Sequence, residues 1–382
     1  MKNCNIILFL LLCITIFTSH ENAYALSDSD EKKSHAIDSL LTNSQIEIRT
    51  SYAFFIHHHF EMTSYPAHFP MFELSFQKQT YGKQYWQAYF NYPTIGFSAF
   101  YSNLGNIDII GKAYALYPFI NFPLNKSKTN TFSFRMGVGL GYLTNKYHPT
   151  ENFHNTSIGS NVNAAISLTF EYKRYLSERY KISVFAGLTH FSNGSSTEPN
   201  NGLNIINAGL SATYLLKDAE EYIPKQYSQQ DFKKIKPEFY IGLSYGTKRI
   251  LVFQENYTSV FNLEFYVLDR ISNLSKIGFG LDLVYDATDN IYVKNYYGYN
   301  FEPTFLQLLK PGISLAYELL MGDASFLFNF GYHPYGLDMS YGRWYQKLAL
   351  KVDVGKFIFG KITLNTHFGA ADFIGFGIGV KL

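Results

Sequence analysis

Apolar and polar residues alternate with a period of two through many short segments of this chain. From Phe132 to Tyr142 the even positions are apolar, whereas the odd positions hold Ser, Gly and Arg135. Successive side chains of a strand point to opposite faces, so each segment has one apolar face and one small or polar face. Similar alternation occurs in 166–173, 180–192, 239–246, 277–285 and 374–382. Such repeats predict the antiparallel strands of a transmembrane β-barrel with its apolar face toward lipid.

A soluble β-sandwich also alternates and is the competing interpretation. A sandwich core needs bulky side chains from both sheets, however. Here the second face is dominated by Gly, Ser and Thr, with charged residues such as Arg135 and Glu171. Those residue types suit the narrow polar interior of a small barrel. The predicted fold class is therefore all-β, an antiparallel barrel of the outer membrane.

The strand-like segments fall into two groups. About eight lie in 45–216 and about eight in 237–382, separated by the charge-rich stretch 217–236, which has no alternation. Two architectures fit this count: an eight-stranded unit followed by a second strand-rich half, or one barrel of about sixteen strands. The usual occurrence of one barrel per chain favours the larger barrel, whereas the long linker favours closure after eight strands. Closure at eight is the preferred prediction, and the single barrel is the alternative.

The N-terminus has the features of a secretory signal peptide. Lys2 supplies the positive charge, 6–17 is an apolar run, and Ala23-Tyr24-Ala25 is a small-x-small cleavage site. We expect a signal peptide at 1–25, cleavage near Ala25, and a polar segment at 26–44. The apolar run is too short for a membrane-spanning helix, which needs about 20 residues.

Composition narrows the class further. Both cysteines, Cys4 and Cys13, lie in the predicted signal peptide, so the mature chain has no disulfide and no cysteine metal site. The 32 Tyr and 35 Phe residues suit the aromatic girdles of a membrane barrel. A net charge of +2 gives no reason to expect a nucleic-acid partner. Outer-membrane lipids are the expected surroundings, and the sequence leaves the oligomeric state open.

The candidate chemistry lies at the end of the segment 180–192. Its even positions are apolar or aromatic from Tyr180 to Leu188 and then become His190 and Ser192. Two residues apart on a strand, these side chains project to the same face, about 6 to 7 Å apart. A base and a nucleophile at the rim of an apolar outer wall indicate a substrate that is itself a lipid.

The residues that follow carry a family resemblance. H-F-S-N at His190–Asn193 and P-N-N-G-L-N at Pro199–Asn204 resemble the PagL lipid A 3-O-deacylases, outer-membrane enzymes often labelled acyloxyacyl hydrolases. Their pattern is H-x-S-N, a short loop, P-N-x-G and then a carboxylate. The resemblance covers the signal peptide, the strands up to about Leu216 and this motif, and says little about 217–382.

That resemblance implies an eight-stranded barrel with a His, Ser, Glu triad on its outer surface at the last hairpin. The family cleaves a fatty acyl ester from lipid A, the membrane anchor of lipopolysaccharide. By resemblance, His190 is the base, Ser192 is the nucleophile, and the chain is a carboxylic ester hydrolase with lipid A as its partner. The acyl position and the chain length stay open.

The third member of the triad departs from the family pattern. Asn204 stands where the family has Glu, on the same predicted outward face as Ile206 and Leu210. An amide can orient an imidazole but cannot stabilise the imidazolium by charge. Slower turnover is expected, or Glu198 in the connecting loop completes the triad instead.

Ester cleavage also needs hydrogen-bond donors where the oxyanion develops. Asn193, Gly194 and Asn200 are the candidates, through backbone N–H groups or side-chain amides. Serine chemistry requires neither a metal nor a cofactor, and none is expected.

A non-catalytic barrel, either a pore or a scaffold with a decayed site, is the alternative function. Asn204 and the additional half favour it, and no catalytic motif is found in 237–382. The presence of His190, Ser192 and Asn193 together with the P-N-N-G loop favours the esterase, which is the preferred interpretation.

Overall fold

The structure is a computed structural model that describes residues 41–56, 68–125, 127, 129–217, 222–223, 236–251, 254, 256–298 and 300–382. The predicted signal peptide lies outside the described residues, as do most of the predicted N-terminal segment and most of the linker.

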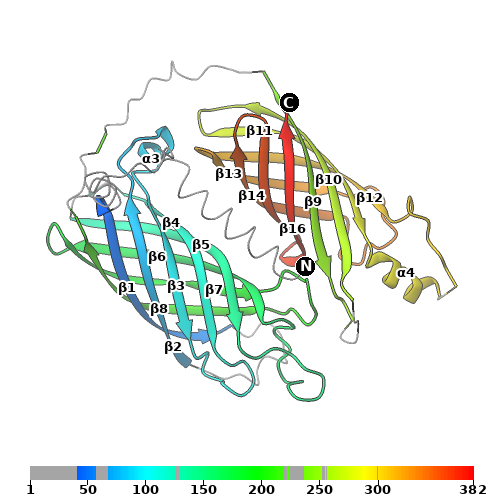
Figure 1. The fold of residues 1–382 in the computed structure, drawn as a ribbon, viewed down its shortest axis with the longest axis horizontal. Helices are drawn as coiled ribbons and strands as arrows, with labels where there is room; N and C mark the ends of the chain where they lie inside the picture. Colours follow the sequence, from blue (N-terminus) through cyan, green and yellow to red (C-terminus); the bar gives the residue numbers. More distant parts are fainter. Residues whose placement is uncertain are drawn as a thin grey trace, which may run out of the picture. The chain divides into compact units, whose positions relative to one another are not determined.

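The strands form two closed antiparallel barrels of eight strands each (Figure 1). The first contains β1 (Ser44–Phe55), β2 (His68–Gln79), β3 (Thr94–Ser102), β4 (Ala113–Pro123), β5 (Asn130–Leu143), β6 (Val162–Tyr175), β7 (Tyr180–Ser192) and β8 (Leu203–Leu215). The second contains β9 (Glu238–Lys248), β10 (Thr258–Arg270), β11 (Ser275–Asp286), β12 (Leu309–Met321), β13 (Ala324–Tyr332), β14 (Trp344–Val354), β15 (Ile358–His367) and β16 (Ala370–Lys381). The predicted fold class is confirmed.

Closure at eight strands excludes the single larger barrel, and that alternative was wrong. In the first barrel β8 pairs with β1 from Gln45↔Leu215 to Phe55↔Ile205. In the second, β16 pairs with β9. Each barrel thereby pairs its own edge strands, which in a membrane would otherwise expose unpaired backbone groups.

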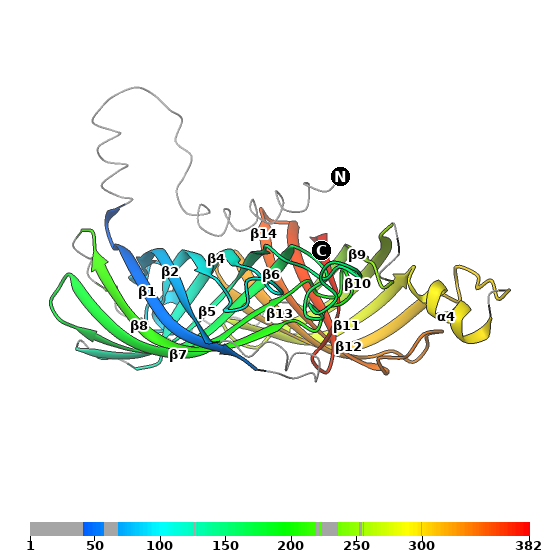
Figure 2. The same cartoon turned by 90° about the horizontal axis from the view of Figure 1, so that it is seen from below.

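In the part of the chain that the structure describes, two helices lie in connections between strands. The short α3 (Tyr85–Tyr89) joins β2 to β3, and α4 (Asp289–Tyr297) follows β11, beyond the strand end (Figure 2). Among the described residues, no helix has the length and apolar character to cross a membrane.

The outer walls of both barrels are apolar, as the alternation predicted. From Gln45 onward, burial alternates along β1, whose outward residues include Ile48 and Tyr52, 62% and 63% exposed. In the second barrel Phe279 on β11 is 69% exposed. Aliphatic and aromatic side chains left this open are stable against lipid, whereas water would make a patch of this extent costly.

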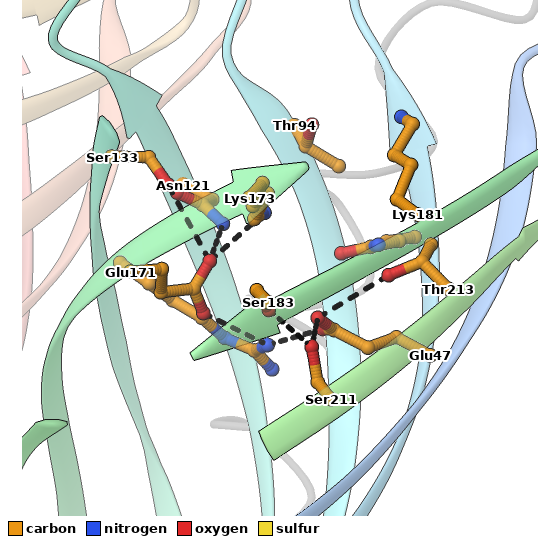
Figure 3. A network of polar contacts seen from close by, with 12 residues as sticks. Glu47, Thr94, Asn121, Ser133, Glu171, Lys173, Lys181, Ser183, Ser211 and Thr213 are labelled. Atoms are coloured by element: carbon orange, nitrogen blue, oxygen red, sulfur yellow. Dashed lines mark hydrogen bonds and ion pairs between the residues drawn. The ribbon is translucent and has the colours of Figure 1, made fainter. Parts of the chain in front are cut away.

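The interior of the first barrel contains a network of buried charges. Glu171 is completely buried and accepts hydrogen bonds from Asn121, at 2.8 Å, and from Ser133 (Figure 3). Lys173 Nζ lies 2.9 Å from the same carboxylate, and Arg49 forms an ion pair with it. The prediction that Glu171 faces the interior is confirmed.

A second set of contacts extends this network around the barrel. Arg135 is 1% exposed and its Nη1 lies 2.6 Å from Glu47 Oε2. Its guanidinium lies over the Phe119 ring, 3.5 Å from the centroid. Because each buried charge has an opposite partner, the low-dielectric interior can hold them as charged groups.

The end of the first barrel that carries the loop between β7 and β8 has an apolar interior instead. Leu104, Ile110 and Ile158, from the loops after β3 and β5, are completely buried there. They join inward-facing strand residues, among them Phe69, Phe100, Phe191, Leu203 and Ile205. The sequence predicted a small and polar interior; at this end large apolar side chains fill it, because the connecting loops fold over the opening and cover it.

Charged pairs also cross the interior of the second barrel. Lys347 is 1% exposed and pairs with Glu264, at 3.0 Å, and with Asp282. Further along, Lys351 Nζ lies 2.7 Å from Glu318 Oε1. At the levels of these ion pairs, side chains therefore fill the interiors of both barrels.

The contacts divide the described chain into two compact units. One unit contains the first barrel, formed by the chain up to Asn193 and again from Pro199. The other unit contains Gly194–Glu198 and the second barrel. The tip of the loop between β7 and β8 thus groups with the C-terminal unit.

Candidate active site

The candidate site is built on the hairpin of β7 and β8. His190 on β7 is paired in register with Asn204 on β8, and Ser192 is paired with Ala164 on β6. All three candidate residues are partly exposed, whereas Thr189, Phe191 and Leu203 between them are buried. His190, Ser192 and Asn204 thus share the outward face.

One hydrogen bond joins two of the candidate residues. His190 Nδ1 lies 2.6 Å from Asn204 Oδ1. A carboxamide oxygen only accepts hydrogen bonds, so the Nδ1 atom carries the proton and donates it. In neutral histidine the Nε2 atom is then the acceptor, which is the state that a general base toward a serine hydroxyl requires.

Gly202 lies directly against the imidazole of His190. A Cβ atom added to Gly202 would lie 2.9 Å from His190 Cε1 and 3.6 Å from Nε2. The backbone φ of Gly202 is 75°, a conformation that side chains disfavour. Its N–H donates to Ser157 O at 2.9 Å. The sequence motif included this glycine, but gave no reason to place it beside the base.

Phe191 anchors the strand between the two candidate residues. Its ring is completely buried and lies 5.8 Å from the Phe100 ring. The ring occupies the space beside Gly141 on β5, where an added Cβ would lie 2.7 Å from Phe191 Cδ1. The apolar interior at this end therefore fixes the backbone from which His190 and Ser192 project outward.

The loop that follows holds the predicted oxyanion donors. Asn193 is 4% exposed, and its N–H donates to Asn200 Oδ1 at 2.9 Å. This bond joins the two ends of the loop and uses the backbone donor of Asn193. The Nδ2 group of Asn200, which carries two hydrogens, is the side-chain donor among the predicted oxyanion candidates.

Two other sequence candidates group with the second compact unit. Gly194 adopts a φ of 60°, and the N–H of Glu198 donates to Arg249 O at 3.0 Å. Glu198 also lines a cavity at the end of the second barrel, with Lys248 and Asp289 among its other lining residues. Their predicted roles in catalysis stay predictions.

Apolar side chains surround the pair on the outer wall. Ile166 on β6 is opposite His190, and Leu188 on β7 is opposite Ile206 on β8. All are partly exposed. A hydroxyl nucleophile and its candidate base therefore stand at the edge of a surface suited to fatty acyl chains.

Two family models match the chain. Residues 71–213 match lipid A 3-O-deacylase (PagL), and residues 237–382 match the C-terminal domain of acyloxyacyl hydrolase. Together they cover well over half of the sequence. The chain belongs to the PagL lipid A 3-O-deacylase family. It is thus a member of a family of carboxylic ester hydrolases, and the resemblance noted in the hairpin motif is confirmed.

The second match assigns the C-terminal half to a domain family, whereas the hairpin motif said little about this half. Residues 237–382, which form the second barrel, are the acyloxyacyl hydrolase C-terminal domain of this PagL-family chain. The deacylase match itself ends at 213, within β8. His190, Ser192 and Asn204 all lie inside the deacylase match.

Solved structures give weaker likenesses. A crystal structure of the outer-membrane enzyme PagL is 14% identical, covering 45% of this chain and 98% of that chain with a TM-score of 0.30. A triple mutant of the Rhodopseudomonas blastica porin is 4% identical, covering 89% and 99% with a TM-score of 0.17. Among curated proteins, none matches this sequence.

Proposed function

We propose that this PagL-family protein is an outer-membrane serine esterase that removes a fatty acyl chain from lipid A. The hydrogen bond between His190 Nδ1 and Asn204 Oδ1, made on the outward face beside Ser192, is the observation that carries the proposal. It orients the imidazole as a base, and the apolar wall around it suits a substrate embedded in lipid.

The reaction proceeds in two steps. Ser192 Oγ attacks the ester carbonyl while His190 Nε2 accepts the hydroxyl proton. The tetrahedral intermediate collapses, and the imidazolium returns that proton to the departing alcohol oxygen of the lipid. Water then attacks the acyl-enzyme with the same base assisting, which releases a fatty acid and restores the serine hydroxyl.

Asn204 orients the base without adding charge. A carboxylate at this position would also stabilise the imidazolium that forms during attack. The amide provides the hydrogen bond at Nδ1 and therefore the tautomer, but not this electrostatic stabilisation. We expect a functional triad with a lower turnover than one completed by a carboxylate.

Asn200 is the strongest candidate for oxyanion stabilisation. Its Oδ1 accepts the Asn193 N–H, which fixes the plane of the carboxamide. Its Nδ2 group is the donor that we propose for the oxyanion, in the loop that follows the strand end with Ser192. Preorganised donors of this kind contribute about 2.7–4 kcal/mol to the stability of the transition state.

The outer membrane is the proposed location. Both barrels have outward residues that are aliphatic or aromatic on strand after strand. The predicted signal peptide directs the chain out of the cytoplasm, and the family match supports the same compartment. The C-terminal barrel is proposed to support insertion or stability without contributing a catalytic residue.

A pore is less well supported by the described residues. Arg49, Arg135 and Glu171 cross the interior of the first barrel, and Lys347 with Glu264 crosses the second. A conducting barrel would need an aqueous path at these levels. The remaining alternative is a scaffold with a decayed site, and the experiment must distinguish it from the esterase.

The test is to incubate purified protein with lipid A and to weigh the lipid product. The esterase is supported if lipid A loses the mass of one hydroxyacyl chain with the wild-type protein and keeps its mass with the Ser192→Ala variant. An unchanged lipid A mass with folded protein would instead support the scaffold.

A further inference from the structure

We propose that Gly202 is a positioning residue for His190, held in place by the loop between β5 and β6. This inference rests on the proposed function of His190 as the base. It goes beyond the candidate triad because Gly202 provides no chemical group of its own. It acts through the space that it leaves beside the imidazole.

The imidazole is held at two neighbouring ring positions. Asn204 accepts the hydrogen bond from Nδ1, and Gly202 leaves open the space beside Cε1, which a Cβ would enter to 2.9 Å. The Cε1 atom lies between Nδ1 and Nε2 in the ring. A group that displaced Cε1 would therefore rotate Nε2 away from its position and strain the bond to Asn204.

Two independent requirements select glycine here. The first is the backbone φ of 75°, which residues with a Cβ disfavour. The second is the contact with His190 Cε1, since a Cβ at 2.9 Å from this atom is closer than van der Waals packing allows. The turn explains the first requirement, whereas the second arises from the position of the imidazole beside Gly202.

The neighbouring loop fixes the position of Gly202. Its N–H donates to Ser157 O at 2.9 Å, and Ser157 is completely buried. The next residue, Ile158, belongs to the apolar cluster inside the barrel. The strand end that carries His190 is anchored in that same cluster by Phe191. The positions of Gly202 and His190 are thus both set by the same buried apolar cluster.

Buried amides tie this loop to the rest of the barrel end. Asn155 is completely buried and its Nδ2 donates to Ile109 O at 3.0 Å. Asn152 Nδ2 donates to the same carbonyl at 2.9 Å. The loop after β3, the loop after β5 and Gly202 are therefore linked through backbone carbonyls, and the position beside the imidazole is determined by all of them.

The direct test of the contact is nuclear magnetic resonance of the full chain in detergent micelles. The His190 Cε1 proton should show a nuclear Overhauser effect to a Gly202 Hα, with the histidine signal assigned by its loss in His190→Ala. Absence of this effect in folded protein overturns the proposal without reference to activity.

The kinetic test uses Gly202→Ala. We expect kcat to fall about 100-fold with KM little changed, since misplacing a catalytic group by about 1 Å has an effect of that size. The acidic limb of the pH profile should also move, because the surroundings of the base have changed. Gly82→Ala is the matched control: φ is 102°, an added Cβ would lie 2.9 Å from Ile223 O, and the residue is at the other end of the barrel.

A double-mutant comparison separates the ring contact from backbone strain. Gly202→Ala should lower the urea midpoint of unfolding more in the presence of His190 than in His190→Ala, where no ring meets the added methyl group. Equal losses overturn the proposal. Full activity of Gly202→Ala in an active wild-type background also overturns it, whereas an inactive wild type with the Overhauser effect present overturns the proposed function itself.

Discussion

His190 and Asn204 face each other across the β7–β8 hairpin, with Nδ1 and Oδ1 2.6 Å apart. The register of the hairpin creates this contact, because the two residues are direct partners in the ladder. An asparagine thereby occupies the place at which a PagL-like triad would present a carboxylate to the imidazole. In the proposed mechanism, asparagine at this position keeps the orientation of the imidazole but does not stabilise the imidazolium by charge.

Ser192→Ala and His190→Ala should each abolish lipid A deacylation while the barrel stays folded. Both side chains project outward from the strand end, so neither supports the interior packing. Product mass measures activity, and heat-modifiable migration measures folding. Val184→Ala, an exposed change on the same face of β7, is the control and should retain activity. Near-wild-type activity in either site variant would remove the catalytic assignment, and a serine-directed phosphonate should label only protein that retains Ser192.

Asn204→Glu should raise turnover about tenfold, because a carboxylate adds stabilisation of the imidazolium to the orientation already present. Asn204→Ala should lower turnover, since the Nδ1 proton loses its acceptor. Initial rates on lipid A give both comparisons. If Asn204→Glu lowers the rate and Glu198→Gln abolishes it, then the loop carboxylate is the third member.

Glu171→Gln should lower the free energy of unfolding by about 3–5 kcal/mol, because it leaves buried cations without their partner. Arg49 and Lys173 both pair with this carboxylate. Urea unfolding in detergent measures the change. Glu178→Gln, in the exposed turn between β6 and β7, should have little effect; similar losses in the two variants would show that the interior network is not what stabilises the barrel.

Truncation at about Leu216 should lower the amount of protein in the membrane more than the activity per inserted molecule. The first barrel closes through its own β1 and β8 and contains the whole hairpin. Quantitative blotting of outer membranes, with activity normalised to it, measures both quantities. An abundant but inactive truncated protein would mean that 237–382 is needed for catalysis.

Strand identity and side-chain direction could be predicted from the sequence because both depend on a local period of two. The outward positions of His190, Ser192 and Asn204 follow from their parity with Leu188 and Ile206. Closure at eight strands could not be read from alternation, because it depends on the pairing of Gln45 with Leu215, distant in the chain. The family motif and the linker favoured it only indirectly.

Loop contacts were the least predictable part of the site. Gly202 was visible in the P-N-N-G motif, but its contact with His190 requires the loop path that the Ser157 carbonyl fixes. Likewise, the alternation placed Phe191 on the inward face without showing that this end of the barrel is apolar. That property comes from loop residues such as Ile158, whose burial no strand period encodes.

The last strand of the first barrel is pinned to the first at the level of the site, where the N–H of Ile56, just after β1, donates to Asn204 O at 2.8 Å. The backbone of Asn204 is therefore held by the pairing of β1 with β8, which closes the barrel. An exported chain in which β1 and β8 have not yet paired would lack this hydrogen bond to the backbone of Asn204. Catalytic competence would then mature late in assembly, so a precursor in transit would be a poor hydrolase of the lipids that it meets.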